Sequence, residues 1–196
     1  MGKNTIIVGI VVLIVGVGIG YLFWGNSPLI QSGSHMMQDG TMMGQNIDQH
    51  FIVQMIPHHE GAIAMAKVAL ERSKRPEILS LANGIIEAQE GEIADMRSWY
   101  QLWFGSAPTE GGMGMMHMDG MSGDTSVLAS VSAAEFDREF IKQMIPHHEM
   151  AIMMAQMLQS STQRNEMKQL ADNIITSQSR EIDMMRGWLK SWYSAD

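Results

Sequence analysis

The sequence predicts an all-α protein: an antiparallel four-helix bundle built from two duplicated helical hairpins and preceded by an N-terminal hydrophobic helix. The first observation is that the phrase Met-Ile-Pro-His-His-Glu occurs twice, at 55–60 and at 144–149. The second is that residues 48–105 align without a gap on residues 137–194, an offset of 89 residues. The third is that apolar residues in both copies recur at spacings of three and four, which is typical of amphipathic helices.

Composition excludes several classes of site. The formal net charge of −8, from 13 basic and 21 acidic residues, argues against a nucleic-acid-binding protein, because a phosphate backbone requires a basic face. The chain has no cysteine, which excludes disulfides, thiolate metal sites and thiol nucleophiles. Methionine is unusually frequent, with 21 residues, although it is not among the commonest residues of soluble domains.

The first element, residues 1–24, contains an almost unbroken apolar run from Thr5 to Trp24. A run of about 20 residues is long enough to cross a membrane. Because Lys3 precedes this run, the positive-inside rule leaves the N-terminus in the cytoplasm and the body outside. The alternative is a cleaved signal peptide, but the run is long for one and no Ala-x-Ala site follows. We favour an anchor at 5–24, and both interpretations predict a periplasmic or otherwise extracytoplasmic body.

Residues 25–46 follow as a segment rich in Gly, Ser, Gln, Asn and Met with little charge. This composition predicts a flexible linker. The bundle then occupies residues 47–196, divided into a hairpin repeat, a methionine-rich linker and a second hairpin repeat.

The first hairpin, residues 47–104, is expected to start near Asn46 and Gln49, which resemble a capping box. Its first helix should run to about Ser73. Pro76 is expected at an early position of the second helix, where its missing N–H is harmless.

The second hairpin, residues 132–196, repeats this pattern. Ser132 and Glu135 fit a capping box, and the first helix should end near Ser160. Two hairpins that each expose one apolar face are expected to pack on each other, which gives a four-helix bundle.

The linker between the hairpins, residues 105–131, is dense in thioethers. A methionine on a helix is more often packing than ligand, but these methionines lie in a polar, glycine-rich segment without a helical face. We therefore favour soft-metal ligands here, with contact to a membrane or to a partner groove as the alternative. The candidate ligands of this segment are Met113, Met115, Met116, His117, Met118 and Met121.

The repeated histidines adjoin an apolar stripe. At about 100° per residue, His58 points into the stripe and His59 lies at its border, while Gln89 and Glu92 occupy stripe positions of the second helix. A buried carboxylate must pair, become neutral or meet a metal. One interpretation is a satisfied network in which Glu92 accepts a hydrogen bond from His58. Because the arrangement occurs twice with methionines beside it, we favour a metal site in which the carboxylate orients an imidazole.

The donor types indicate the ion. Methionine with histidine selects a soft ion such as Cu(I), and Ag(I) shares that softness. Glutamate with histidine alone would permit zinc or iron, but the Glu-x-x-His and His-Glu-x-x-His signatures are absent from the sequence. Met150 and Met153, beside the second histidine pair, fit ligation and packing equally well, whereas we interpret Met157 and Met167 as packing residues.

Both copies share one longer pattern, Phe-x-x-x-Met-x-x-His-His-x-x-Ala-Ile-x-Met-Ala followed by Leu-Ala-x-x-Ile-Ile-x-x-Gln-x-x-Glu-Ile-x-x-Met-x-x-Trp. This pattern resembles the bacterial ferritin-like domain-of-unknown-function family, and residues 48–194 are similar to its periplasmic copper-binding members. The resemblance implies a helical bundle that binds copper, and also silver, outside the cytoplasm and contributes to copper resistance. It implies metal ligands at His58, His59, His147, His148, Met55, Met65, Met96, Met144, Met154 and Met185.

The predicted function is therefore that of an extracytoplasmic Cu(I)- or Ag(I)-binding protein. It is expected to sequester or transfer the ion rather than to act as an enzyme, and a copper exporter or another copper-trafficking protein is a candidate partner. Two alternatives stay open. One is a metallo-oxidase with a hard ion held by histidine and glutamate, and the other is a membrane-tethered bundle that binds a partner through its methionine surface.

Overall fold

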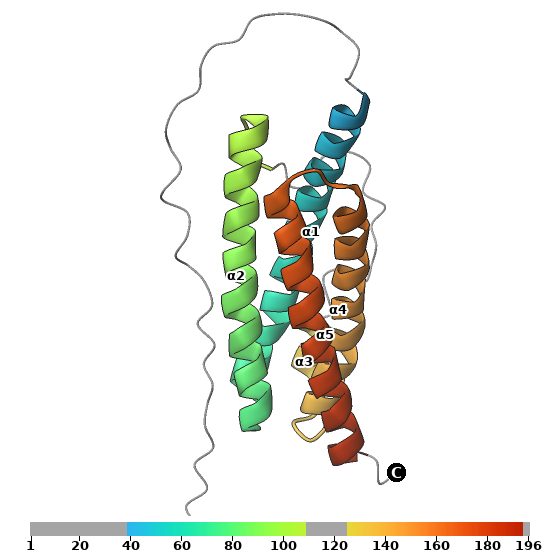
Figure 1. Ribbon diagram of the computed structural model, residues 1–196. Coiled ribbons are helices and arrows are strands. Elements are labelled where there is room, and N and C mark those ends of the chain that lie inside the picture. Colours follow the sequence, from blue (N-terminus) through green and yellow to red (C-terminus); the bar gives the residue numbers. More distant parts are fainter. Residues whose placement is uncertain (1–38, 109–124, 194–196) are drawn as a thin grey trace, which may run out of the picture. The chain divides into compact units, whose positions relative to one another are not determined.

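The computed structural model describes residues 39–108 and 125–193 of the 196-residue chain. Within those two ranges there is no β-strand, so the prediction of an all-α protein is confirmed. The helices are α1 (Asp39–Arg72), α2 (Pro76–Phe104), α3 (Thr125–Ser130), α4 (Phe136–Ser161) and α5 (Asn165–Tyr193) (Figure 1). None of these described helices is long and apolar enough to cross a membrane. The hydrophobic helix predicted at 5–24 lies outside the described residues.

The first helix of each repeat starts at a different residue from the one predicted. Helix α1 begins at Asp39 and continues through Asn46, so Asn46 is not an N-cap and the end of the predicted first linker is helical. Helix α4 begins at Phe136, and its N-cap, Glu135, makes no side-chain capping bond. The Glu135 N–H donates instead to the Ser132 carbonyl over 3.1 Å. A backbone turn thus takes the place of the predicted capping box and moves the helix start.

A three-residue connection joins the two long helices of each repeat. The Ser73 N–H donates to the Ala69 carbonyl over 2.9 Å, and the Ser73 hydroxyl accepts from the Arg75 N–H over 3.1 Å. Thr162 makes the same two bonds after α4, over 2.8 and 3.1 Å. Pro76 is the first residue of α2, as predicted, where its missing N–H removes no intrahelical bond. Each repeat is therefore a pair of packed helices, α1 with α2 and α4 with α5.

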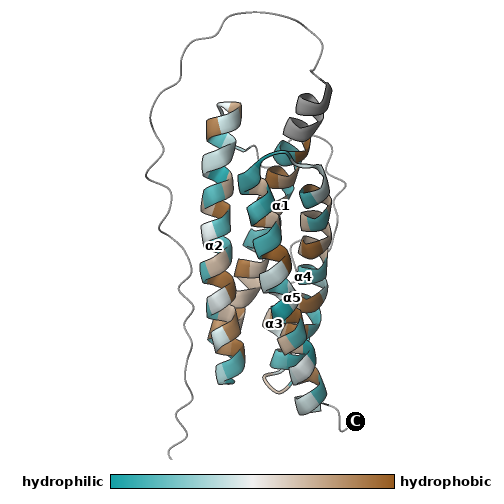
Figure 2. Cartoon of the chain, in the orientation of Figure 1, coloured by the Kyte–Doolittle hydropathy of each residue, from teal (hydrophilic) through white to brown (hydrophobic). Residues whose placement is uncertain are grey.

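The hydrophobic core consists of two clusters, and both repeats contribute to each. The first cluster joins Met55 of α1 to Ala151 of α4. The second joins Met65 of α1 to Phe140 of α4. Hydrophobic and hydrophilic residues alternate around the long helices, as Figure 2 shows, and the apolar sides supply these clusters. Neither repeat completes its own core, so the packing depends on both.

Two equivalent ion pairs connect the repeats near the ends of the helices. Arg75 Nε lies 3.1 Å from the Asp137 carboxylate, and its guanidinium covers a tryptophan ring of α5 at 4.3 Å. Arg164 Nε lies 3.2 Å from the Asp48 carboxylate, and its guanidinium covers a tryptophan ring of α2 at 4.0 Å. Each arginine thus bonds the other repeat, and the duplication relates the two pairs.

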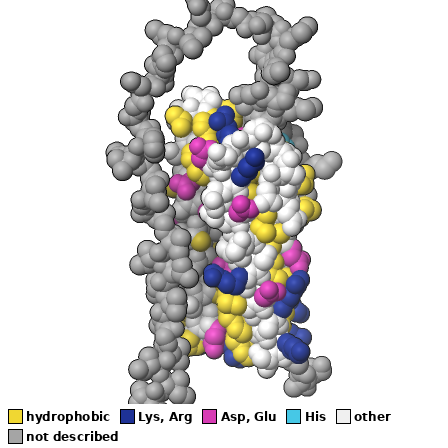
Figure 3. Space-filling view, viewed as in Figure 1, with side chains coloured by type: hydrophobic (Ala, Val, Ile, Leu, Met, Phe, Trp, Pro, Cys, Tyr) yellow, Lys and Arg dark blue, Asp and Glu magenta, His cyan; other side chains and the backbone are white. Residues whose placement is uncertain are grey.

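The short helix α3 lies inside the segment predicted as a linker. Leu128 is fully buried there, and the Arg72 guanidinium donates to the Leu128 and Val131 carbonyls. These bonds attach the segment before α4 to the end of α1. On the face seen in Figure 3, basic and acidic side chains are interspersed between hydrophobic strips.

Candidate metal centre

Both Met-Ile-Pro-His-His-Glu phrases lie inside long helices. Pro57 is within α1 and Pro146 is within α4, and neither proline ends its helix. A proline removes one intrahelical hydrogen bond and crowds the preceding turn, at a cost of about 3 kcal/mol in an ordinary helix. In both helices two buried histidines follow this weakened turn directly.

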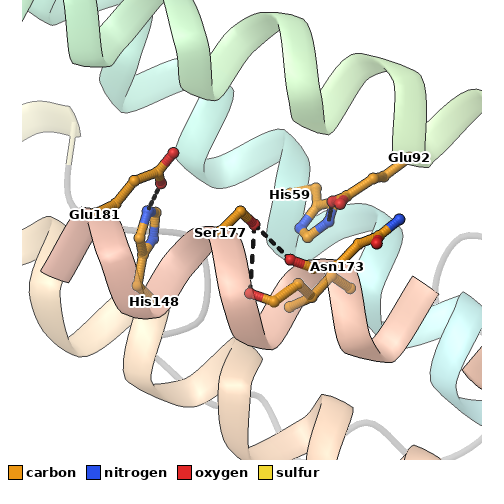
Figure 4. A network of polar contacts seen from close by, with 7 residues as sticks. His59, Glu92, His148, Asn173, Ser177 and Glu181 are labelled. Atoms are coloured by element: carbon orange, nitrogen blue, oxygen red, sulfur yellow. Dashed lines mark hydrogen bonds and ion pairs between the residues drawn. The ribbon is translucent and has the colours of Figure 1, made fainter. Parts of the chain in front are cut away.

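A carboxylate from the neighbouring helix meets one histidine of each pair. His59 Nε2 lies 2.7 Å from Oε2 of Glu92, and His148 Nε2 lies 2.6 Å from Oε2 of Glu181 (Figure 4). Both imidazoles are fully buried. Because a carboxylate accepts, Nε2 carries a proton, and in the neutral tautomer with this proton the lone pair is on Nδ1. Nδ1 of both histidines is buried without a hydrogen-bond partner among the described residues.

The pairing of Glu92 with His59 corrects the sequence-based assignment, which gave Glu92 to His58. The helical wheel placed His59 at the border of the apolar stripe. Helix α2 packs on α1, and its Glu92 carboxylate meets the border residue His59, which is fully buried. A wheel gives the direction of a side chain but not the neighbour that covers it.

The other histidine of each pair meets its counterpart between the repeats. The ring centroids of His58 and His147 are 3.8 Å apart, with the planes inclined by 43°. Burial, followed by repulsion from His147 and then from the other two imidazoles, lowers the pKa of His58 to about 2. His58 is therefore neutral at physiological pH, and neither of its buried ring nitrogens has a hydrogen bond of ordinary geometry. It keeps a lone pair available at the junction of the repeats.

Four imidazoles therefore cross the core, with a carboxylate at each end. The ring centroids are 6.3 Å apart in the first histidine pair and 6.4 Å apart in the second. In the parts of the chain that the structure describes, no three His, Asp or Glu side chains are close enough together to hold an ion. Each end supplies one buried lone pair and one carboxylate, which suits a monovalent cation with few ligands better than a multiply charged one.

The predicted methionine ligands of the helices are mostly core residues. Both repeats contribute predicted methionine ligands to each hydrophobic cluster. The first cluster holds Met55 and Met96, with the half-buried Met154 packed against it, and the second holds Met65, Met144 and Met185. All except Met154 are fully buried. Thioethers and imidazoles thus lie in one core, where a thioether can fill space or bind a soft ion.

The remaining methionines of α4 do not join the core. Met150 is half-buried, and Met153 is 48% exposed. Met157 is 59% exposed, so its interpretation as a packing residue is wrong, whereas Met167 is fully buried in the first cluster as predicted. Nine residues after Met144, at about 100° per residue, Met153 lies on the opposite side of the helix.

The candidate ligands of the methionine-rich linker lie outside the described residues. They are Met113, Met115, Met116, His117, Met118 and Met121.

Sequence reasoning missed the meeting of His58 with His147 and treated each copy as a separate site. The duplication itself carried the signal. When two equal units pack around a two-fold axis, equal residues near that axis face each other. A residue that is buried and central in one unit is therefore a candidate to contact its own copy.

The chain is similar in sequence and fold to known proteins. Residues 48–195 match the family described as "Domain of unknown function (DUF305)". The solved protein CopM is similar in its Cu(II)-bound, Cu(I)-bound and silver-soaked forms, with 50, 47 and 46% sequence identity and TM-scores of 0.69, 0.66 and 0.66. The alignments cover 74% of this chain and 97, 97 and 96% of those chains.

A viral relative matches a shorter part of the sequence. The "Uncharacterized protein L153" of Acanthamoeba polyphaga mimivirus is 45% identical over 51 residues, which are 26% of this chain. The matched part spans about a third of that protein, 34% of its length.

Proposed function

The chain belongs to the DUF305 family, and on that premise we propose that it is an extracytoplasmic protein that binds Cu(I), or Ag(I), and sequesters or transfers it in copper resistance. The observation that carries the proposal is the buried row of four imidazoles, in which Nε2 of His59 and of His148 bonds a carboxylate and Nδ1 has no hydrogen-bond partner among the described residues. CopM has been solved with Cu(I) and with silver, which supports this choice of ion, and it has also been solved with Cu(II).

The charges favour a monovalent ion. A carboxylate that bonds one nitrogen of an imidazole, while the other nitrogen binds a metal, is a recurrent arrangement in metal sites. In each repeat one carboxylate balances one positive charge. A divalent ion at the same place would leave an uncompensated charge in the core, which is costly.

The buried thioethers add neutral, soft donors that favour Cu(I) and Ag(I) over zinc or iron. The proposed ligand set of the core is His58, His59, His147, His148, Met55, Met65, Met96, Met144, Met154 and Met185. In the proposal the four long helices form an antiparallel bundle of two hairpins. The ion is bound and released unchanged, so no enzyme activity is part of it.

Three further elements of the proposal rest on sequence patterns. The segment 113–121, through its thioethers and His117, would act as a weaker capture site. Residues 5–24 would hold the body outside the cytoplasm as an anchor. A copper exporter or another trafficking protein would be the recipient of the ion.

The test is a Cu(I) titration of the full chain in competition with a Cu(I) chelator. The double variant His58→Leu with His147→Leu should bind Cu(I) more weakly than the wild type. The loss in affinity should exceed the factor of about 10–100 that is typical when a residue hydrogen-bonded to a metal ligand is replaced. His50→Ala is the control, because His50 is an exposed histidine of α1 whose side chain bonds Gln54. Equal Cu(I) retention by all three proteins, with unchanged circular dichroism, would defeat the proposal.

A further inference from the structure

Helix α4 carries a group of methionines that the core does not use. Met153 is 48% exposed, Met157 is 59% exposed and Met150 is half-buried. Their spacings of three and four residues place them on one side of the helix. Grouped exposed apolar side chains mark binding sites more often than isolated ones do.

The first repeat provides an internal comparison. Gly61, Ala64 and Val68 occupy the three corresponding positions of α1. Helix α1 has the same internal proline and the same buried histidine pair, so neither the helix nor the core requires methionine at these positions. The three thioethers of the second repeat therefore need an explanation other than folding.

Exposure rises stepwise along α4 away from the buried histidines. His147 is 3% exposed. Met150 follows it by one turn and is intermediate in exposure. Met153 is 48% exposed and Met157 is 59% exposed. The half-buried Met154 packs against the first core cluster, so thioethers continue from the surface to the core. Met157 follows His147 by ten positions, which is about 15 Å along the helix axis.

We propose that Met150, Met153 and Met157 form an entry site at which a monovalent soft ion, Cu(I) or Ag(I), binds before it reaches the buried imidazoles. This inference rests on the proposed function and adds a route to that same site. Thioethers suit the task because they bind soft ions and have no proton to lose. The ion forms a bond to a surface sulfur as its bond to the donor breaks. It then exchanges that sulfur for an imidazole nitrogen, without any change in oxidation state.

The burial of the histidines explains why such a route is needed. All four core imidazoles are buried, at most 3% exposed, so a donor that still holds the ion cannot reach them. The exposed sulfurs of α4 can meet that donor. The first repeat has no equivalent group, so among the described residues this entry site belongs to the second repeat alone.

The experiment measures transfer of Cu(I) from its bicinchoninate complex to the metal-free full chain under anaerobic conditions. The decay of the chelator colour gives the second-order rate constant, and the final absorbance gives the number of ions retained. The test variant carries Met150→Leu, Met153→Leu and Met157→Leu, which conserve volume and apolar character. Met184→Leu is the matched control, since Met184 is 37% exposed on α5 and outside the entry site.

The triple variant is expected to take up Cu(I) about tenfold more slowly, within the range by which mutations at one interface change association rates. Its final Cu(I) content should equal that of the wild type, and the control should match the wild type in both quantities. An unchanged rate, or an equal slowing by Met184→Leu, would overturn the entry site and leave the proposed function intact. A wild-type chain that removes no Cu(I) from the chelator would overturn both.

Discussion

At His58 the demands of packing and of chemistry conflict. Its imidazole is 1% exposed and has three other imidazoles as neighbours. Burial and repulsion both oppose protonation, which is why its pKa falls to about 2. In an unfolded chain the pKa of histidine is about 6.5. Between these two values the folded protein binds one proton fewer at this residue than the unfolded chain does.

This difference predicts how the stability of the metal-free protein depends on pH. The lowered pKa means that protons favour the unfolded chain, so the contribution of His58 is complete above about pH 6.5 and is lost as the pH falls. The loss is about 1.4 kcal/mol of unfolding free energy per pH unit. The variant His58→Gln removes this contribution. Urea unfolding between about pH 5.5 and 4.5 should therefore show a pH dependence that is flatter by that amount.

The comparison of slopes isolates one residue, because the remaining titrating groups are common to both proteins. His50→Gln alters an exposed histidine of the same helix and should retain the wild-type slope. Parallel profiles for the wild type and His58→Gln would show that the imidazole is not held neutral by the core.

At the scale of the elements, the arginine that follows each first helix fastens the two repeats together. The two ion pairs are alike in geometry but not in burial: Asp48 is 1% exposed and the Asp137 side chain is 14% exposed. Burial raises the pKa of Asp48, while bonds to Thr162 and attraction from Arg164 oppose this rise. The Asp48 carboxylate therefore depends more strongly on its arginine.

We expect Arg164→Ala to lower the unfolding free energy by about 3–5 kcal/mol, because it leaves a buried carboxylate unpaired and uncovers Trp103. Arg75→Ala should cost less, because water reaches Asp137. Urea unfolding measures both. Adding Asp48→Asn to Arg164→Ala should recover part of the loss, since the unpaired charge is gone. Equal losses in the two single variants would contradict the role of burial.

The sequence predicted the elements well where the pattern is periodic and less well where neighbours decide. The buried positions of Met55 and Met144 follow from spacing alone, because a helix has one apolar side. The start of α4 could not be predicted from spacing, because a turn closed by the Ser132 carbonyl competes with the capping box. The partner of Glu92 and the exposure of Met157 depend on which helix covers which side. That information lies in the packing of α1, α2, α4 and α5, not in any one of them.

At the scale of the whole molecule, the two repeats share one core, and neither repeat has a core of its own. Each hydrophobic cluster needs both repeats, and the central contact joins His58 to its own counterpart. The central histidine contact and the two ion pairs between the repeats use residues that both copies contain. Asp48 and Arg75 of the first repeat correspond to Asp137 and Arg164 of the second. Each repeat therefore contains both an aspartate and an arginine of this kind, and each of them pairs with its partner in the other repeat.

This self-complementarity predicts the behaviour of one repeat on its own. A fragment of residues 39–108 exposes a face that lacks its other half, so it should be poorly folded as a monomer. Two fragments can restore the missing contacts. His58 would contact its own copy, and Arg75 would bond Asp48 and cover Trp103 of the other fragment. Met65 would take the place that Met154 has in the full chain. We therefore expect a helical homodimer, observed by sedimentation together with circular dichroism. Arg75→Ala in the fragment should shift the equilibrium towards unfolded monomer, because it removes both equivalent ion pairs at once. A fragment that folds as a monomer would show that one repeat can close its own core, against the shared clusters seen in the full chain.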